Sequence, residues 1–521
     1  MNLDFYTNTN FTSVEDIEAR YPDRRIPGEI KVTRVAPSPT GFTHIGSIYA
    51  GLLCERIAHQ SGGIFFLRIE DTDKKREVPG SAEKIAKALN DYGIHIDEGM
   101  TAEGTEIGAY GPYLQSARKE IYRTFAKRLL DTGNAYPCFC TTEELDDVHK
   151  KQELQKIRPG YYGQWATCRN RSKEEVEKLL QEGKPYVVRF KSTGNFENKI
   201  HVTDLIKGER ELSQNDQDVV IIKSDGLPTY HFAHVIDDHF MGTTDVIRGD
   251  EWFSSLPLHI ELFGTLGFKL PRFGHFSPIQ KMEGSSRRKL SKRKDPEADV
   301  TFYEAEGYPK EAVIEYLLNL ANSNFEDWRE NNPFAANTDF KLSFEKLPQS
   351  GALFDIEKLR SISKEVISRM TAEEVTKEAL SWATKYDNDL ASEIEKDLAY
   401  ATAVFDIERS STEKVRKDIA LWKDLRNEVG YFFDPLFTPN TETILASLAT
   451  LPKEDVTKAL NGFFTHYNEK DTKDTWLQKM RNLATSLGYA PTTKELKQNR
   501  DTYKGSISDI TKIFRVLLTG K

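Results

Sequence analysis

The chain has 521 residues, of which 38% are hydrophobic and 29% charged, and its formal net charge is −9. This length exceeds what one hydrophobic core supports and favours three or four domains. No apolar run approaches the ~20 residues that span a bilayer, and the polar N-terminus lacks a secretory signal, so we expect a cytoplasmic protein without membrane insertion. The acidic balance argues against indiscriminate nucleic-acid binding but is compatible with local basic surfaces.

Residues 30–70 have the pattern of a strand, a glycine-containing turn, a helix and a second strand. The strands are IKVTRVA and IFFLRIE, and the apolar residues between positions 47 and 60 share one helical face. A right-handed crossover places the turn at the carboxyl edge of a parallel sheet, where open α/β folds bind their ligands. The sequence therefore predicts a nucleotide site at this turn.

Three further regions follow this unit along the chain. Residues 109–214 are expected to form an α+β insertion, with helices near 116–131 and 172–181. Residues 219–248 return to short β-type runs, VVIIK and DVIR, as expected if the chain re-enters the first sheet. Beyond residue 302 almost the whole pattern is helical. The predicted fold is an α/β Rossmann-like catalytic domain with an α+β insertion and an all-α C-terminal region.

The turn RVAPSPTGFTHIGS carries the first candidate phosphate-binding residues. His44 and Gly46 fall at the start of the helix, whose free N–H groups favour anions. His44 is expected to donate a hydrogen bond to charge developing on the α-phosphate of ATP, while Gly46 lets the nucleotide approach the backbone. Taken alone, the same pattern also fits a histidine that only caps a helix.

A second candidate is the basic segment RRKLSKRK, residues 287–294, which has six cations among eight residues. Lysines suit a mobile phosphate clamp, because a flexible stem lets a compact cation follow charge that moves towards departing pyrophosphate. We expect Lys289 and Lys292 to act in this way. Taken alone, the segment also fits a solvated basic loop.

Together, THIGS and KLSKR resemble the two signature motifs of class I aminoacyl-tRNA synthetases, in the expected order. The segments RVAPSPTG, FLRIEDTD, GPYLQSARKEIY, KSDGLPTYHFAHVIDDHFMG and DVIRGDEW are similar to those of bacterial-type glutamyl-tRNA synthetases, and the resemblance runs from about residue 31 to residue 518. Glutaminyl relatives and eukaryotic glutamyl enzymes typically have a PEPNG-like sequence where this chain has PSPTG, which disfavours both.

The resemblance implies an enzyme that joins L-glutamate to the 3′ end of tRNA(Glu), using ATP and Mg²⁺, through a glutamyl-adenylate. It assigns catalysis to His44, Lys289 and Lys292. It assigns ATP binding to His44, Gly46, Glu251, Lys289, Leu290, Ser291, Lys292 and Arg293. It assigns glutamate binding to Arg34, Ala36, Ser38, Glu70, Tyr230, His234, Arg248 and Trp252.

Selection of glutamate would depend on Arg34 and Arg248, whose rigid forks match carboxylates. A fork left unpaired beside glutamine would penalise that substrate. Glu70 would receive the α-ammonium, and His234 departs from the asparagine that bacterial relatives often have. Other interpretations stay open: a surface cation for Arg34, a solvated acidic loop or metal site for EDTD at 70–73, and a buried core residue for Trp252.

The cysteines also allow two interpretations. Cys138, Cys140 and Cys168 resemble a zinc-binding pattern of some bacterial family members, but asparagine replaces the histidine of that pattern. Zn²⁺ would then need a fourth ligand, such as Tyr162 or His149. Alternatively, the cysteines are reduced thiols that pack as small hydrophobic side chains.

The resemblance also divides the chain into five parts and implies a monomer. Charging of tRNA(Gln) besides tRNA(Glu) stays open. The parts are an N-terminal extension at 1–29, a discontinuous catalytic domain at 30–108 and 215–300, an acceptor-binding insertion at 109–214, a stem-contact region at 301–370 and a helical anticodon-binding region at 371–521.

Three other functions fit the sequence less well. An enzyme that attaches glutamate to a modified tRNA base generally lacks the long helical region. A silent RNA-binding paralogue would be expected to lose His44, Lys289 or the pocket arginines, all of which are present. An unrelated adenylyltransferase would have a His-x-Gly-His turn, where this chain has Ser47.

Overall fold

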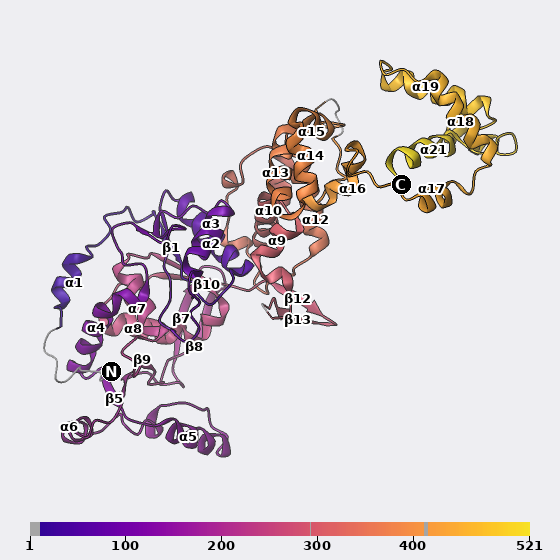
Figure 1. The fold of residues 1–521 in the computed structure, drawn as a ribbon. Coiled ribbons are helices and arrows are strands. Elements are labelled where there is room, and N and C mark those ends of the chain that lie inside the picture. Colours follow the sequence, from indigo (N-terminus) through magenta and orange to yellow (C-terminus); the bar gives the residue numbers. More distant parts are fainter. Residues whose placement is uncertain (1–10, 292, 411–414, 521) are drawn as a thin grey trace. The chain divides into compact units, whose positions relative to one another are not determined.

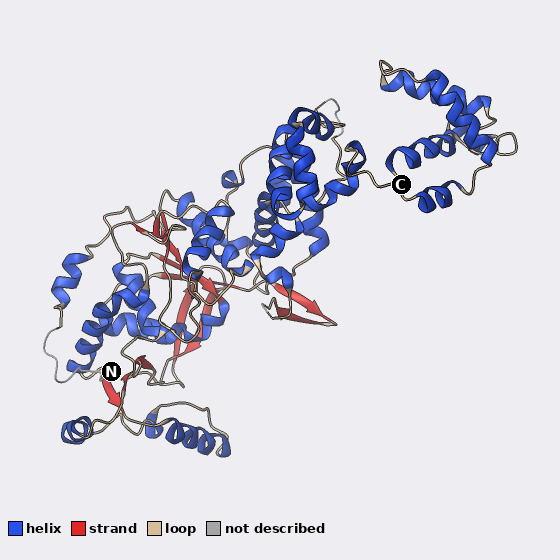
Figure 2. Cartoon of the chain, viewed as in Figure 1, coloured by secondary structure: helices blue, strands red, loops and turns tan. Residues whose placement is uncertain are grey.

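The computed structural model describes residues 11–291, 293–410 and 415–520 (Figure 1). Lys292, one of the two lysines expected to contact ATP, lies outside the described residues. The described strands all belong to the first of two compact units (Figure 2). The first unit comprises Met1–Ala305 and Lys310–Ile362, and the second comprises Glu306–Pro309 and Ser363–Lys521.

The first unit contains a sheet with the parallel strands β1 (Val32–Val35), β2 (Ile64–Leu67) and β3 (Glu98–Met100). Strand β4 (Glu106–Ile107) is antiparallel at its edge. Helix α2 (Ile45–Gln60) makes the crossover from β1 to β2, and α3 (Ser81–Asp91) connects β2 to β3. The predicted strand–turn–helix–strand unit is thus confirmed, and the apolar face of α2 is buried.

A second set of strands lies next to β1. Strands β10 (Asp245–Gly249) and β11 (Arg272–Phe276) are parallel and are joined by α8 (Leu256–Leu266). Thr244, directly before β10, donates its N–H to the carbonyl of Val32 at 3.0 Å, so the DVIR run lies beside β1, as the expected return of the chain requires, although β10 pairs with β11 in a separate sheet. Strands β7 (Lys199–Asp204) and β8 (Gly208–Ser213) follow β11, although they lie in the range expected to form an insertion.

The VVIIK run joins a different sheet, which corrects the prediction made for it. Strand β9 (Val220–Ile222) pairs antiparallel with β6 (Val187–Phe190), which pairs antiparallel with β5 (Ala135–Cys138). The reason is that an apolar run specifies a buried strand but not its partner. Between β9 and β10 the chain forms α7 (Tyr230–Phe240), a helix that the β-type runs around it did not predict.

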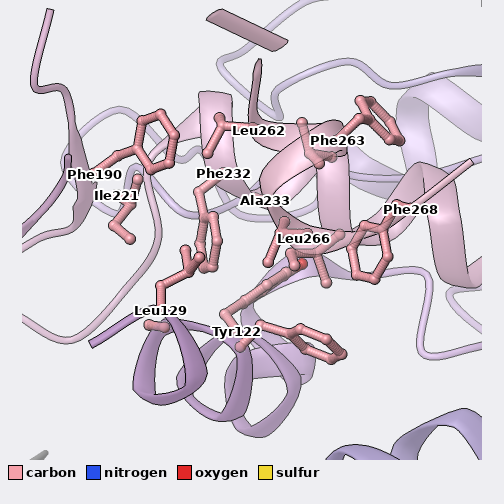
Figure 3. Packing of buried hydrophobic residues seen from close by; sticks show 14 of the residues in the cluster. Tyr122, Leu129, Phe190, Ile221, Phe232, Ala233, Leu262, Phe263, Leu266 and Phe268 are labelled. Carbon is pink, nitrogen blue, oxygen red and sulfur yellow. The ribbon is translucent and has the colours of Figure 1, made fainter. Parts of the chain in front are cut away.

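One hydrophobic core joins α4 (Lys119–Asp131), α7 and α8 to strands β6 and β9. Figure 3 shows Tyr122 and Leu129 of α4 below Phe232 of α7 and Leu266 of α8. Ile17, in α1 (Val14–Arg20), is fully buried in the same core. The core fixes the orientation of α7 and, with it, the polar side chains on the other faces of that helix.

The expectation of a helical region beyond residue 302 is confirmed. The second unit contains two cores, one that includes Val375, Leu390 and Phe405 and one that includes Ile510 and Phe514. The remaining helices of the described chain are α5 (Thr142–Leu154), α6 (Lys173–Gln181), α9 (Val300–Glu306), α10 (Lys310–Ala321), α11 (Phe325–Asn331), α12 (Ile356–Arg369), α13 (Ala372–Tyr386), α14 (Asn388–Lys396), α15 (Leu398–Phe405), α16 (Leu425–Val429), α17 (Thr441–Leu448), α18 (Lys453–His466), α19 (Lys473–Ser486), α20 (Thr493–Gln498) and α21 (Ile507–Thr519).

Candidate functional site

A cavity of about 500 Å³ lies at the carboxyl ends of β1, β2, β10 and β11. Parallel strands with helical crossovers place ligands at this edge. Ser291 and His234 are not among the described residues that line it, and Arg293 lines a separate hollow beside Phe42. The expected site residues that line the cavity are Arg34, Ala36, Ser38, His44, Gly46, Glu70, Tyr230, Arg248, Glu251, Trp252, Lys289 and Leu290.

His44 is the residue at which α2 begins. Its backbone is extended, and its Nδ1 accepts the N–H of Gly46 at 2.8 Å. A neutral imidazole that accepts at Nδ1 carries its proton on Nε2, so His44 caps the helix and can also donate to a ligand in the cavity. A Cβ on Gly46 would lie 2.9 Å from His44 Nδ1, so a side chain there would displace the ring.

The basic segment forms a hairpin, β12 (Gln280–Glu283) and β13 (Ser286–Lys289), followed by a loop. Lys289 Nζ lies 3.4 Å from Glu251 Oε1, and both residues line the cavity. Asp295 accepts hydrogen bonds from the Arg288 guanidinium and, at 2.8 Å, from the N–H of Ser291. The bond from Arg288 holds the pKa of Asp295 well below its usual range. Residues 280–289 are therefore a paired hairpin, in which Arg288 is partly buried while the side chains of Arg287 and Lys289 are exposed.

Arg34 and Glu70 belong to a buried network at one wall of the cavity. Arg34 donates from Nε and Nη2 to the two oxygens of Asp238, at 3.0 and 3.2 Å. Arg68 donates to Asp238 at 2.8 Å and to Glu70 at 3.3 Å. Burial raises the pKa of Glu70 to about 7, against the opposing effect of Arg68 and Arg34. Arg34 is not a surface cation, and Glu70 is not part of a solvated loop.

Arg248 forms another wall and is only 6% exposed. It donates from Nε to His275 Nε2 at 2.9 Å, from Nη2 to His259 Nδ1 at 3.1 Å and from Nη1 to the Tyr230 hydroxyl at 3.2 Å. Burial lowers the pKa of Arg248. Among the described residues its guanidinium has no carboxylate in direct contact, and because Arg248 lines the cavity it can pair with an anionic ligand that binds there.

Tyr230 and Trp252 supply the aromatic part of the cavity, with ring centroids 3.9 Å apart. Trp252 is half-buried, which does not match the core tryptophan considered from composition. His234 stacks behind Tyr230 at 5.2 Å and is completely buried, with its Nδ1 2.8 Å from Asp238. Burial lowers the pKa of His234 to about 3, so the ring is neutral.

The three cysteines of the predicted metal site lie together, with their sulfur atoms within 4.8 Å of one another. The Tyr161 hydroxyl is 3.4 Å from Cys138 Sγ and 3.3 Å from Cys140 Sγ. Three thiols and a phenol match the donor number of tetrahedral Zn²⁺. Tyr162 is not the fourth donor, which corrects that expectation. It is extended, so its side chain points away from that of Tyr161, and its hydroxyl donates to the carbonyl of Arg158 at 2.6 Å.

Four residues next to the cavity were not predicted: Arg68, Asp238, His259 and His275. One sequence signal was available for Asp238, because the spacing of four from His234 brings both side chains to one face of a helix. His259 and His275 approach Arg248 from α8 and β11 through tertiary packing, which no local pattern encodes.

The comparisons with known proteins agree on one family. The sequence profile described as "tRNA synthetases class I (E and Q), catalytic domain" matches residues 31–361. A glutamate–tRNA ligase of Clostridium perfringens strain 13 is 48% identical over 500 residues, which cover 96% of this chain and 91% of the relative. One of Clostridium beijerinckii is 46% identical over 519 residues, which cover 99% and 93%.

A solved structure gives the same result. The glutamate tRNA ligase from Elizabethkingia meningosepticum, crystallised in complex with its amino acid, has a TM-score of 0.76 and 29% sequence identity. The match covers 95% of this chain and 94% of that one. Separately, no helix among the described residues combines the length and the apolarity needed to cross a membrane.

Proposed function

Because the chain belongs to the class I tRNA synthetases for glutamate and glutamine, and within them to the glutamate–tRNA ligases, we propose that it attaches L-glutamate to the 3′ end of tRNA(Glu). First, an oxygen of the glutamate α-carboxylate attacks the α-phosphorus of ATP, the bond to pyrophosphate breaks and glutamyl-adenylate forms. Then the terminal ribose hydroxyl of the tRNA attacks the activated carbonyl and AMP leaves. Neither step needs a nucleophile from the protein.

The observation that carries the choice of substrate is the pair of unlike groups at the cavity, Arg248 and Glu70. No carboxylate of the described residues contacts the buried Arg248, and a carboxylate of glutamate would provide this partner. Glu70, when ionised, would accept the α-ammonium. Arg34 already pairs with Asp238, which compensates its charge, so its proposed role is to line the glutamate pocket beside Arg248. A neutral side-chain amide in place of a carboxylate would leave buried positive charge unmatched.

ATP would lie on the other side of the cavity, between the start of α2 and the basic hairpin. His44 Nε2–H and the helix N-terminus at Gly46 would stabilise charge on the α-phosphate. Lys289 would leave Glu251 to follow the departing pyrophosphate, and Leu290 would line the ATP side of the cavity. Contacts of ATP with Ser291, Lys292 and Arg293 stay predictions from the family motif. Mg²⁺ bound to the phosphates would neutralise part of their charge.

The substrate assignment is tested by the variant Arg248→Gln in tRNA(Glu) aminoacylation. We expect the KM for glutamate to rise at least ~10-fold, because a desolvated charge-assisted contact is lost, and the KM for ATP to change little. The control Arg272→Gln removes a half-exposed arginine at the start of β11, paired with Asp245, and should leave both constants close to the wild type. An unchanged glutamate KM in Arg248→Gln would refute the assignment. Parallel assays with purified tRNA(Gln) establish whether it is charged as well.

The cysteine cluster would hold a structural Zn²⁺, with Cys138, Cys140, Cys168 and Tyr161 as ligands. Arg171 Nε donates to Cys168 Sγ at 3.5 Å, which favours the thiolate form that binds the metal. The competing interpretation is three packed thiols without a metal. Elemental analysis of the purified protein decides between them: near one zinc per chain supports the site and none excludes it. Tyr161→Phe should lower the zinc content, whereas Tyr162→Phe should not.

The remaining proposals follow the family. Residues 109–214 would bind the tRNA acceptor end, 301–370 would contact the stem and 371–521 would bind the anticodon. The protein would be a cytoplasmic monomer. Size-exclusion chromatography with light scattering tests the oligomeric state directly.

A further inference from the structure

The groups that contact Arg248 differ from those that contact two other buried arginines, Arg34 and Arg118. Arg34 contacts Asp238 directly, and Arg118 contacts Asp237 directly at 2.7 Å. Arg248 is instead held by imidazoles: His275 at 2.9 Å, His259 at 3.1 Å and His234 at 3.5 Å. Carboxylates thus neutralise Arg34 and Arg118 directly, whereas among the described residues no carboxylate contacts Arg248, which lines the cavity.

Hydrogen bonds on the far side of each ring fix which nitrogen faces Arg248. His275 Nδ1 lies 2.6 Å from Asp204 and His234 Nδ1 lies 2.8 Å from Asp238, so both rings donate to an acid and keep Nε2 as an acceptor. Each of these two acids is therefore separated from Arg248 by the width of an imidazole.

His259 also presents an unprotonated ring nitrogen to Arg248, but its other nitrogen faces a histidine and not an acid. Its Nδ1 accepts from Arg248, so its proton lies on Nε2, which is 3.0 Å from His231 Nδ1. All three rings must be neutral to accept from a guanidinium. Burial lowers the pKa of each of them, which keeps them neutral.

A neutral acceptor orients a guanidinium without cancelling its charge, whereas a carboxylate does both. A buried cation that serves only the fold is better placed against an acid, because an uncompensated buried charge is costly. Three neutral acceptors around Arg248 are therefore expected if the ligand itself supplies the negative charge that compensates the guanidinium.

From this arrangement we infer that His234, His259 and His275 are positioning residues that aim Arg248 at the cavity and preserve its positive charge for a carboxylate of glutamate. The inference rests on the proposed assignment of Arg248 to that substrate. It adds three side chains, two of them absent from the residues expected from sequence, to the determinants of amino-acid binding.

The test compares His259→Asn with His259→Asp in the full-length enzyme. Asparagine and aspartate have the same shape and can both accept near the position of Nδ1, but aspartate brings a negative charge into contact with Arg248. His259 is the best site, because the group behind it is His231 and not an acid. We expect the glutamate KM of the Asp variant to exceed that of the Asn variant at least ~10-fold, with similar ATP KM values. Equal glutamate KM values in the two variants would overturn the inference.

A second pair of variants, at His275, tests the inference independently if His259→Asp does not fold. His275→Gln keeps an acceptor near the position of Nε2, and His275→Met has a similar size without that acceptor. The Met variant should raise the glutamate KM at least ~10-fold over the Gln variant, and equal values would again contradict the inference. The variant Arg248→Gln distinguishes failure of the substrate assignment from failure of the inference about the histidines. If Arg248→Gln leaves the glutamate KM unchanged, the substrate assignment itself fails. If Arg248→Gln raises the glutamate KM but neither histidine pair shows a difference, only the role of the histidines fails.

Discussion

Glu70, the proposed partner of the α-ammonium group, has a buried carboxyl group that costs folding stability when it is ionised. Burial raises its pKa to about 7, from an ordinary value of 4.5. Below pH 7 the buried carboxyl group is mostly protonated and cannot pair with an ammonium group. Because the folded chain holds this proton more tightly than the unfolded chain, folding stability falls as the pH rises from about 4.5 to 7 and the loss persists above pH 7.

The variant Glu70→Gln tests both consequences. In the wild type we expect the KM for glutamate to fall between pH 6 and pH 8, and in the variant we expect a high KM without this dependence. Thermal unfolding should show the variant more stable than the wild type at pH 8 and nearly equal to it at pH 5, because only the wild type carries a buried charge at the higher pH. A wild-type KM that is flat across this range would show that Glu70 does not titrate there.

For single residues, the sequence predicted which side chains line the cavity better than it predicted the partners that these side chains contact. His44, Glu70 and Arg248 lie in recognisable segments, and the structure brings them together at one cavity. The contact of Arg34 with Asp238 and the approach of His259 and His275 to Arg248 could not be predicted, since tertiary packing brings these distant segments together. The choice between Tyr161 and Tyr162 as the tyrosine beside the cysteines could not be predicted either. The direction of the backbone decides which of the two side chains faces the cysteines.

Among the elements, the start of α2 links helix geometry to the proposed role of His44 at the α-phosphate. Gly46→Ala should stabilise a helix by roughly 0.5–1 kcal/mol through lower backbone entropy in the unfolded chain. Its Cβ, however, would force the His44 ring from its position, and loss of one aligned donor lowers kcat by about 10². We therefore expect an active-site defect without a loss of thermal stability. In the control Gly264→Ala, in α8, a Cβ meets nothing within 4 Å, and kcat should not change.

The two glycines that follow α2, Gly62 and Gly63, allow a test of how closely the chain packs against β1. At Gly63 a Cβ would lie 1.9 Å from the carbonyl oxygen of Lys31, a backbone atom that cannot move aside without distorting the pairing of β1 with β2. Gly62 has φ +71° but open space around it. Gly62→Ala should cost about 1 kcal/mol of unfolding free energy, and Gly63→Ala clearly more. Urea denaturation of the two variants measures the difference, and equal costs would contradict the packing argument.

Local sequence patterns predicted those elements whose structure depends mainly on the apolar spacing within one segment. The β1–α2–β2 unit and the helical C-terminal region follow from apolar spacing and are confirmed. Helix α7 was missed because its residues 230–240 mix histidines and aspartates with apolar residues on all sides, as suits a helix that packs in a core and also carries a buried polar network. The partner of β9 was missed because strand pairing joins segments far apart in sequence.

For the molecule as a whole, Asp237 connects parts that are distant in sequence. It accepts hydrogen bonds from Arg118 at 2.7 Å, Gln115 at 2.9 Å and the Tyr122 hydroxyl at 2.9 Å, and Arg68 of the neighbouring network lies 3.7 Å away. These contacts tie α7 to the segment that leads into α4. All five of these side chains are buried.

Asp237→Asn keeps the shape but removes the charge, which leaves Arg118 as an uncompensated buried cation. We expect a loss of about 3–5 kcal/mol in the unfolding free energy, measured by urea denaturation. The control Asp91→Asn breaks the exposed pair with Lys87 and should cost less than ~1 kcal/mol. Similar losses in both variants would show that the buried network contributes no more than a surface ion pair.

The bonds between Val32 and Thr244 have a consequence for biosynthesis. Each residue donates its N–H to an oxygen of the other, across a separation of 212 residues. A ribosome that adds about 5–20 residues per second leaves one edge of β1 without this neighbour for roughly 10 to 40 seconds. During that interval the nascent chain exposes an apolar strand edge, so cellular yield should depend on holdase chaperones more steeply than the stability of the finished enzyme would suggest.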